Sequence, residues 1–181
     1  IDDDYAWKWA IGRGKTYLLA SDFQKSKKTG RVAALHRRQT RLCEVAESVI
    51  VPSEFMADVV GDWGIVREKI RIVPAGVADF KRVEVAKEEA RKQIGNPGKV
   101  IVSAGPFVSW KGFRMLVKIM PQHISINQFF RLVIIGDGPE LKLLQAMIKN
   151  TNLDKKVYLI QERSKNNLAL YLAAADIFIL N

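Results

Sequence analysis

Cysteine, histidine and long apolar runs are all scarce in this chain of 181 residues. The single cysteine, Cys43, cannot close an intrachain disulfide or build a cysteine-rich zinc site, which is typical of a reducing compartment and predicts a cytoplasmic location. His36 and His123 have no cysteine or carboxylate at ligand spacing, so we expect neither a zinc site nor a hydrolytic triad. No apolar run approaches the roughly 18 residues of a membrane span. The sequence predicts no metal and no cofactor.

Proline and glycine are also few, with 6 and 12 residues, and 48% of the chain is hydrophobic. This composition excludes disorder, collagen-like repetition and low complexity. The chain opens on Asp2-Asp3-Asp4, where a signal peptide would carry basic residues. Three consecutive acids can bind a divalent metal, but they are more typical of a solvated cluster, and we expect them to be exposed.

Acidic residues are outnumbered by basic ones. The chain has 29 Lys and Arg against 19 Asp and Glu, a net charge of +10, and residues 78–181 carry +7 of it. This balance favours an anionic partner, which nucleic acid, a phosphorylated metabolite or an acidic lipid surface would each provide, although a solvated basic surface explains it equally well. The net charge alone does not distinguish these kinds of partner.

A helix expected over residues 31–48 concentrates part of this positive charge. Its apolar positions, among them Leu35, Leu42 and Val45, fall on one helical face. Its arginines lie largely on another face. No aromatic residues are interleaved with them, so we expect no nucleic-acid partner, and the hypothesis for this helix is peripheral contact with an anionic membrane. The arginines are Arg31, Arg37, Arg38 and Arg41.

The order of the expected elements predicts an α/β protein. The first thirty residues look irregular, and a strand (48–52), a helix (53–60) and a second strand (69–73) follow the arginine-rich helix. Beyond a connection at 78–84, strands and helices alternate, and the strands are short continuous apolar runs. Such strands are buried on both faces of a parallel sheet. We expect strands at 100–103, 130–135, 157–160 and 177–180, and helices at 85–94, 110–120, 139–150 and 166–174.

Two glycine-containing loops, residues 103–113 and 135–140, follow the first two strands of this series. Parallel sheets bind ligands at the carboxyl ends of their strands, where glycines allow close approach and helix N-termini attract anions. Lys111 adds a point charge suited to phosphate. Glycine loops also occur for steric reasons alone, so a phosphate site and a purely structural role stay open. The Asp137 carboxylate would repel phosphate, and we expect it to cap the next helix.

Five sequence blocks, in order and at the right spacing, resemble the group 1, family-4-type glycosyltransferases of the GT-B fold. The resemblance covers about residues 33–181. The blocks are AESVIVPS (46–53), EKIRIVPAGV (68–77), GPFVSWKG (105–112), IGDGP (135–139) and LYLAAADIF (170–178).

The resemblance implies two Rossmann-like domains with parallel sheets, both incomplete. Residues 1–77 would close the acceptor-side N-terminal domain, 78–84 would connect the domains, and 85–181 would begin the C-terminal domain that binds a nucleotide sugar. It further implies transfer of a sugar from a nucleotide diphosphate sugar to a glycan or lipid-linked acceptor, with retention, without a metal, and peripheral to the inner face of the membrane. Because both domains are incomplete, we expect this chain alone to be inactive.

The resemblance also implies roles for individual residues, none of them catalytic. Lys111 matches the lysine that contacts the donor diphosphate, and Pro106 stands where the family usually has a second cationic contact, an arginine. This departure favours an alternative, a glycosyltransferase-like module that binds a nucleotide or sugar without catalysis. The expected diphosphate-binding residues are Gly105, Lys111 and Gly112, and the expected nucleotide-binding residues are Gly136, Gly138, Ile160 and Gln161.

Overall fold

The computed structural model describes residues 1–76, 84–95, 98–161 and 165–180. The chain forms two compact units, Ile1–Val77 and Ala78–Asn181. Both units contain parallel strands and helices, which confirms the α/β class. The expected connection at 78–84 lies outside the described residues except for Glu84. The assignment of the two units to an acceptor side and a donor side stays a prediction.

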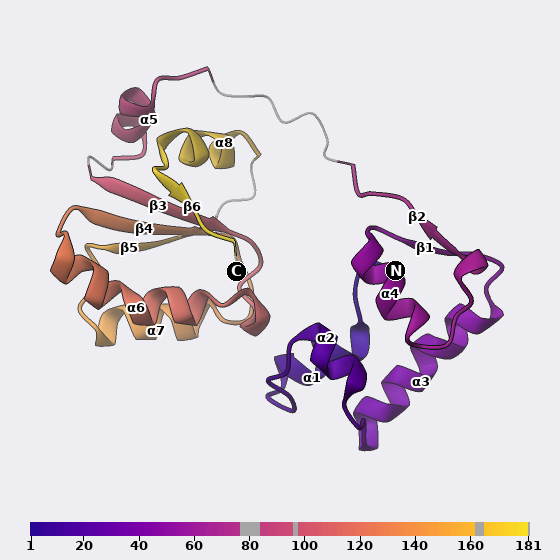
Figure 1. Ribbon diagram of the computed structural model, residues 1–181. Helices are drawn as coiled ribbons and strands as arrows, with labels where there is room; N and C mark the ends of the chain where they lie inside the picture. The colour runs from indigo at the N-terminus through magenta and orange to yellow at the C-terminus, as the bar shows by residue number, and fades with distance from the viewer. Residues whose placement is uncertain (77–83, 96–97, 162–164, 181) are drawn as a thin grey trace. The chain divides into compact units, whose positions relative to one another are not determined.

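The first unit is built on a pair of parallel strands (Figure 1). β1 (Val49–Val51) pairs with β2 (Ile70–Ile72), and α4 (Glu54–Gly61) and the 3-10 turn η1 (Arg67–Lys69) connect them. The Ser53 hydroxyl accepts a hydrogen bond from the N–H of Met56 at 3.3 Å and so caps the N-terminus of α4. The core beneath the strands contains Cys43, Val51, Val60, Trp63 and Ile65.

The first thirty residues contain two helices where an irregular segment was expected: α1 (Tyr5–Gly12) and α2 (Ala20–Lys25). Asp4 holds both of them and is only 4% exposed. Its carboxylate accepts the N–H of Trp7 at 3.0 Å and the side-chain amides of Gln24 and Gln39 at 2.8 and 2.9 Å.

The expectation of an exposed acidic cluster is therefore wrong for Asp4, although Asp2 and Asp3 are exposed. Asp4 can be buried because Gln24 and Gln39, which lie far along the chain on other helices, donate hydrogen bonds to its carboxylate. These bonds compensate for the water that the carboxylate loses on burial. Gln24 also accepts a hydrogen bond from the indole N–H of Trp63 at 3.0 Å. One polar network thus ties the helices of this unit together.

The arginine-rich helix α3 (Gly30–Val45) packs through a different face from the one predicted. Leu42 and Val45 are 62% and 73% exposed, so the predicted apolar face is wrong at its second half. The inward face carries Gln39 and the buried Cys43. In this orientation Gln39 donates to the Asp4 carboxylate and Cys43 packs in the core of the first unit.

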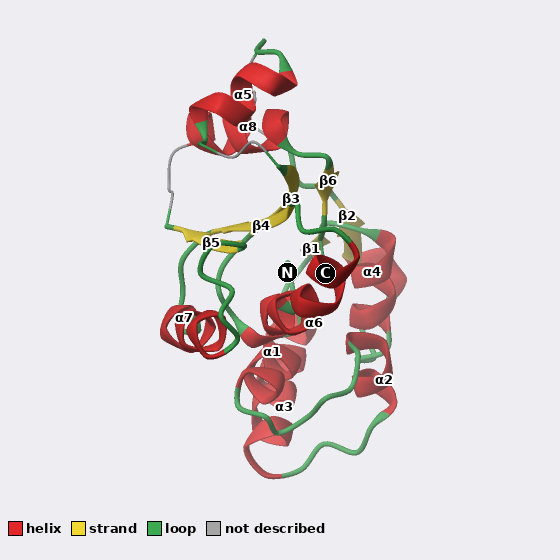
Figure 2. Ribbon diagram, turned by 90° about the vertical axis from the view of Figure 1, so that its left-hand side faces the viewer, coloured by secondary structure: helices red, strands yellow, loops and turns green. Residues whose placement is uncertain are grey.

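The second unit is a four-stranded parallel sheet in the order β5–β4–β3–β6. Helices α6 and α7 cover one face, and α5 and α8 cover the other (Figures 1 and 2). The strands are β3 (Lys99–Ala104), β4 (Phe130–Ile135), β5 (Val157–Ile160) and β6 (Ile177–Phe178), and the helical segments are α5 (Lys87–Gln93), η2 (Ser109–Lys111), α6 (Phe113–Ile126), α7 (Leu141–Asn150) and α8 (Lys165–Ala174).

Both faces of the central strands are buried, as their continuous apolar sequences predicted. Along β4, Leu132 and Ile134 face the α6–α7 side, while Val133 and Ile135 face the α8 side, and all four are at most 3% exposed. The described residues include no helix that is both long and apolar enough to cross a membrane.

Helix α6 continues past the predicted end at Met120 to Ile126, with Pro121 and His123 inside it. Proline removes one N–H donor from a helix. Here Pro121 is exposed, whereas the neighbouring Met120 and Ile124 pack against the sheet. Burial of these two side chains outweighs the single hydrogen bond that proline removes.

Candidate functional site

The carboxyl ends of β3, β4 and β5 bring three loops to one edge of the sheet. These strands are direct neighbours, with Ala104 opposite Ile135 and Ile135 opposite Ile160. The order of the strands reverses between β3 and β6, which lie side by side although α6, α7 and α8 separate them in the chain. Ligands of open parallel sheets bind at such a reversal. The loop after β3, which carries Lys111, therefore lies at the expected position.

Gly136 packs directly on the backbone of the neighbouring loop. Its N–H donates to the carbonyl of Ile160 at 2.9 Å, and the N–H of Gly105 donates to Ile135 at 2.9 Å. A Cβ atom on Gly136, where φ is +154°, would lie 1.9 Å from the carbonyl oxygen of Gly105. Only glycine fits there, so the steric explanation that the sequence left open applies to this position.

Phe107 locks the two glycine loops together. Its N–H donates to the carbonyl of Asp137 at 2.8 Å, and its carbonyl accepts from the N–H of Glu140 at 3.0 Å. A Cβ atom on Gly138 would lie 2.7 Å from the Phe107 carbonyl oxygen. The Phe107 ring is fully buried and meets the Phe113 ring edge-on at 5.6 Å. The two loops therefore form one packed structure.

Lys111 lies across Gly105 at the end of β3. A Cβ atom on Gly105 would come 3.7 Å from Cε of Lys111. Lys111 forms no ion pair with the part of the chain that the structure describes. Gly112 adopts the left-handed conformation, with φ of +65°, and ends η2 so that α6 can begin. The structure thus brings Gly105, Lys111 and Gly112 together, and Gly136 and Gly138 lie against them.

Asp137 has a structural role, but it does not cap α7. Its carboxylate accepts the N–H of Gly138 at 2.8 Å and the side-chain amide of Gln161 at 3.1 Å. Glu140 occupies the N-cap position of α7 and makes no side-chain cap hydrogen bond there. Through Asp137, the loop after β5 is joined to the second glycine loop, which places Gln161 and the preceding Ile160 beside Gly136.

Sequence reasoning missed an ion pair that links the two glycine loops. Nε of Arg114, at the start of α6, donates to Oε1 of Glu140 at 2.8 Å. Glu140 is 8% exposed, and its Oε2 atom is buried without a hydrogen-bond partner among the described residues. The pair is separated by 26 residues, so only the packing of the loops reveals it.

The surroundings of His36 are those of a packed side chain. Across the described ranges, no three His, Cys, Asp or Glu side chains are placed to hold a metal ion. His36 meets the Trp63 ring edge-on at 5.8 Å. Burial, together with the charge of Lys28, lowers the pKa of His36, although Asp4 acts in the opposite direction. His36 is therefore an uncharged packing residue at neutral pH.

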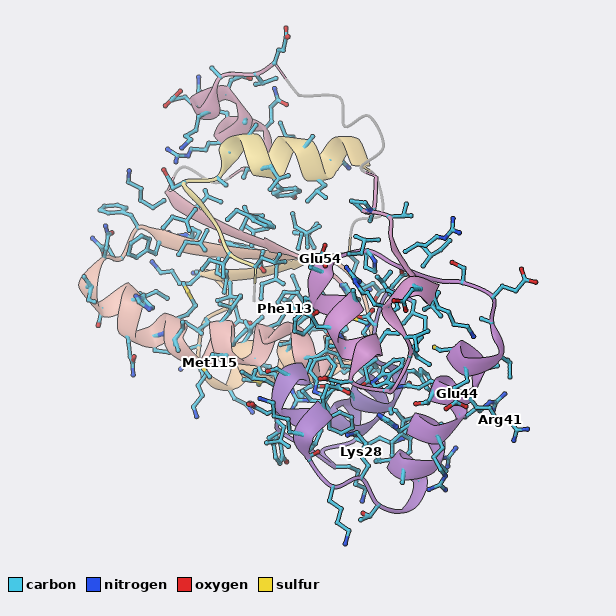
Figure 3. All side chains as sticks on the ribbon, turned by 45° about the vertical axis from the view of Figure 1, so that its right-hand side comes forward. Lys28, Arg41, Glu44, Glu54, Phe113 and Met115 are labelled. Carbon is cyan, nitrogen blue, oxygen red and sulfur yellow. The ribbon has the colours of Figure 1, made fainter. Side chains whose placement is uncertain are left out.

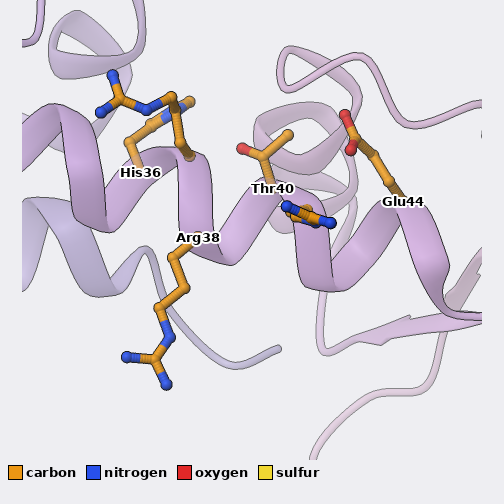
Figure 4. A pocket seen from close by; sticks show the side chains of 6 residues that line it. His36, Arg38, Thr40 and Glu44 are labelled. Carbon is orange, nitrogen blue, oxygen red and sulfur yellow. The ribbon is translucent and has the colours of Figure 1, made fainter.

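A basic groove of about 600 Å³ runs along α3 in the first unit. Figure 4 shows His36, Thr40 and Glu44 on one side of the helix, whereas Arg38 points to the other. All four arginines of the helix are exposed. At about 100° per residue, the four arginines fall within one arc of about 120° around the helix axis. The groove is lined by His36, Arg37, Arg38, Thr40, Arg41 and Glu44.

The sequence of the second unit matches a known protein family. The family model described as "Glycosyl transferases group 1" matches residues 85–181, which is more than half of the chain. The chain belongs to the group 1 glycosyl transferases. The match contains both glycine loops and Lys111.

Two curated proteins are similar to this group 1 chain over about three quarters of its length. The alpha-monoglucosyldiacylglycerol synthase of Streptococcus pneumoniae is 29% identical over an alignment of 140 residues that covers 74% of this chain and 32% of that protein. The phosphatidylinositol N-acetylglucosaminyltransferase GPI3 subunit of Saccharomyces cerevisiae is 28% identical over 135 residues, which are 74% of this chain and 27% of that protein. The group 1 chain therefore spans about a third of the length of these relatives.

Solved structures resemble the group 1 chain in fold. The Anabaena protein Alr3699/HepE, in complex with UDP-glucose, has a TM-score of 0.69 and 20% identity, over 80% of this chain and 41% of that one. The pneumococcal O-GlcNAc transferase GtfA, in complex with UDP and GlcNAc, has a TM-score of 0.62 and 16% identity, over 81% and 28%. These likenesses show the GT-B fold.

Proposed function

We propose that the protein transfers a sugar from a nucleotide diphosphate sugar to a glycan or lipid-linked acceptor. The observation that carries this proposal is the position of Lys111, which lies across Gly105 where the order of the strands reverses. Two solved structures of the same fold contain UDP or UDP-glucose, which supports a nucleotide sugar as donor. Residues 85–181 then begin the donor-binding domain, and residues 1–77 close the acceptor side.

The proposed chemistry requires stabilisation of a leaving nucleoside diphosphate. Negative charge grows on the diphosphate as the bond to the sugar breaks, and a fixed positive group nearby lowers the barrier. Lys111 supplies that charge, and Gly105 and Gly112 allow the diphosphate to approach the backbone. Gly136, Gly138, Ile160 and Gln161 would contact the nucleotide. Retention of configuration and independence of metal ions are inferred from the family resemblance alone.

We further propose a lipid-linked acceptor at the inner face of a membrane, in the cytoplasm. The names of two relatives support it, because one is named as a synthase of alpha-monoglucosyldiacylglycerol and the other as a phosphatidylinositol N-acetylglucosaminyltransferase subunit. The exposed arginines of α3 provide positive charge for such a surface. Nucleic acid is not proposed as a partner.

Pro106 favours a second candidate, a module that binds a nucleotide or sugar without catalysis. Pro106 is exposed beside Gly105 and offers neither a positive charge nor an N–H donor. Replacing it by arginine in a full-length protein distinguishes the two, since an enzyme keeps or gains turnover and a binding module stays inactive. For the 181-residue chain alone, we propose that sugar nucleotides are bound but not turned over.

The site is tested by titrating the chain with UDP and GDP in a calorimeter. We expect Lys111→Ala to weaken binding by about 10- to 100-fold, because a hydrogen bond to a charged group contributes about 1.5–3 kcal/mol. Lys118→Ala is the matched control, since Lys118 is an exposed lysine on α6, the helix that follows Lys111. Equal affinity of the Lys111 variant and the wild type would exclude the proposed diphosphate site.

A further inference from the structure

The loop between α1 and α2 exposes three consecutive apolar residues. Tyr17, Leu18 and Leu19 are 89%, 41% and 71% exposed. Single exposed apolar residues are common on protein surfaces, but a contiguous group marks an interaction site. The three residues therefore require an explanation.

The backbone of this loop is held in place. The carbonyl of Leu18 accepts the indole N–H of Trp7 at 2.9 Å, and its N–H donates to the Thr16 hydroxyl at 3.2 Å. The carbonyl of Leu19 accepts the N–H of Phe23, which is buried, at 2.9 Å. The side chains of Tyr17–Leu19 are thus presented to solvent from a fixed backbone.

Positive charge is concentrated around the same segment. Residues 11–41 contain nine Lys and Arg and a single acid, Asp22, a net charge of +8. The other residues of 1–77 contain four basic and nine acidic residues, a net charge of −5. The first unit is therefore strongly polarised along its sequence.

Ring contacts and hydrogen bonds hold part of this charge on α1, α2 and the start of α3, of which α1 and α2 flank the apolar loop. The Trp9 ring lies against the guanidinium groups of Arg13, at 4.6 Å, and Arg31, at 5.2 Å, which joins the end of α1 to the start of α3. Nζ of Lys28 donates to the last carbonyls of α2, among them Phe23 at 2.9 Å. Lys25 and Lys27 are exposed. Figure 3 labels Lys28, which lies just before the start of α3, and Arg41, which lies near the other end of that helix.

We propose that the loop Tyr17–Leu19 inserts into the surface of an anionic lipid bilayer, with Arg13, Lys25 and Lys27 contacting the lipid phosphates. This inference rests on the proposed lipid-linked acceptor and names the surface that meets the membrane. Tyrosine is favoured at the interface between lipid and water, leucine leaves water for the acyl region, and basic residues add attraction to anionic headgroups. A nucleic acid would attract the same charge but would leave both leucines in water.

The test is sedimentation of the chain with phosphatidylglycerol vesicles, compared with phosphatidylcholine vesicles. We expect Tyr17→Ser/Leu19→Ser to lower the partition coefficient at least tenfold. Lys25→Gln/Lys27→Gln should lower it about 25-fold on the anionic vesicles, since each basic residue contributes about fivefold. Ile126→Ser is the control, because Ile126 is 80% exposed on α6 in the second unit.

A second measurement detects insertion directly. An environment-sensitive dye on Leu19→Cys should shift its emission to the blue on phosphatidylglycerol vesicles, while a dye on Ile126→Cys should not. Cys43 does not compete for the dye, because it is 2% exposed and burial raises the pKa of its thiol.

Three outcomes overturn the inference: the wild-type chain fails to sediment with the vesicles, the serine variant sediments like the wild type, or the Leu19 dye shows no shift. Binding that depends only on the lysines indicates a general polyanion surface. UDP and GDP titrations of the same variants are expected to match the wild type. They test the proposed donor site separately, so failure of the lipid surface and failure of the donor site are distinguishable.

Discussion

Gly136 and Gly105 have nearly the same backbone conformation, with φ of +154° and +151°, but very different surroundings. A Cβ atom on Gly136 would strike the carbonyl oxygen of Gly105, whereas one on Gly105 would only touch Lys111 and Phe113 at 3.7 Å. An L-residue would be strained at both positions, because both have positive φ. The difference in stability between an alanine variant at one position and at the other therefore measures the steric clash alone.

We therefore expect Gly136→Ala to lower the free energy of unfolding by about 2 kcal/mol more than Gly105→Ala. Urea unfolding of both variants, followed by circular dichroism, gives the comparison. Similar losses of stability in the two variants would show that the second loop can move away from the first.

At the scale of single residues, the sequence correctly placed Lys111 and the glycines in loops that follow apolar strands, and their role in binding stays a prediction. It could not predict the environment of Asp4 or the pairing of Arg114 with Glu140. Each of these depends on partners 20 or more residues away, Gln24 and Gln39 in the first case. Side-chain hydrogen bonds between distant helices leave no local pattern.

Among the elements, α5 is attached to the end of the sheet by Asp176. The carboxylate accepts the N–H of Val100 at 2.8 Å and Nη2 of Arg91 at 2.5 Å, and Nζ of Lys87 lies at 3.5 Å. Burial acts to raise the pKa of Asp176, but the Val100 N–H and the positive charges of Arg91 and Lys87 outweigh it and lower the pKa below its usual value. The charged form therefore stabilises the fold.

Because the pKa of Asp176 is lower in the folded state, this stabilisation is present above the ordinary aspartate pKa of about 3.9 and is lost as the pH falls below it. We expect Asp176→Asn to lower the free energy of unfolding by about 1–2 kcal/mol at pH 7 and to match the wild type near pH 2. Urea unfolding at both pH values checks this. Glu89→Gln is the control, since Glu89 forms an exposed pair with Lys92 and should change little. An equal loss at both pH values would contradict the electrostatic explanation.

The strands β4 and β5 have the bounds that the sequence predicted. In a sheet that helices cover on both faces, every side chain of a central strand can be buried, so the strand coincides with the continuous apolar run between two turns. Helices were harder to delimit. α1 and α2 are short and have no clear apolar periodicity of their own. They are held in place by the hydrogen bonds of Asp4 and by the burial of Phe23. α6 passes through a proline because packing on the sheet continues beyond it.

For the whole molecule, the described cores each lie within one of the two units. We expect residues 84–181, expressed alone, to fold and to unfold cooperatively in urea, because the sheet buries apolar residues on both faces without help from residues 1–76. The loss caused by Asp176→Asn should be the same in this piece and in the full chain. A non-cooperative transition of the piece would show that it needs the first unit.

The lock that Phe107 forms between the two glycine loops has an energetic consequence for any ligand. Ordering a loose loop upon binding costs conformational entropy, and that cost is subtracted from the affinity. In this protein the loops are already ordered in the folded chain, because backbone hydrogen bonds join Phe107 to both Asp137 and Glu140 before a ligand binds. Recognition at this edge is thus preorganised.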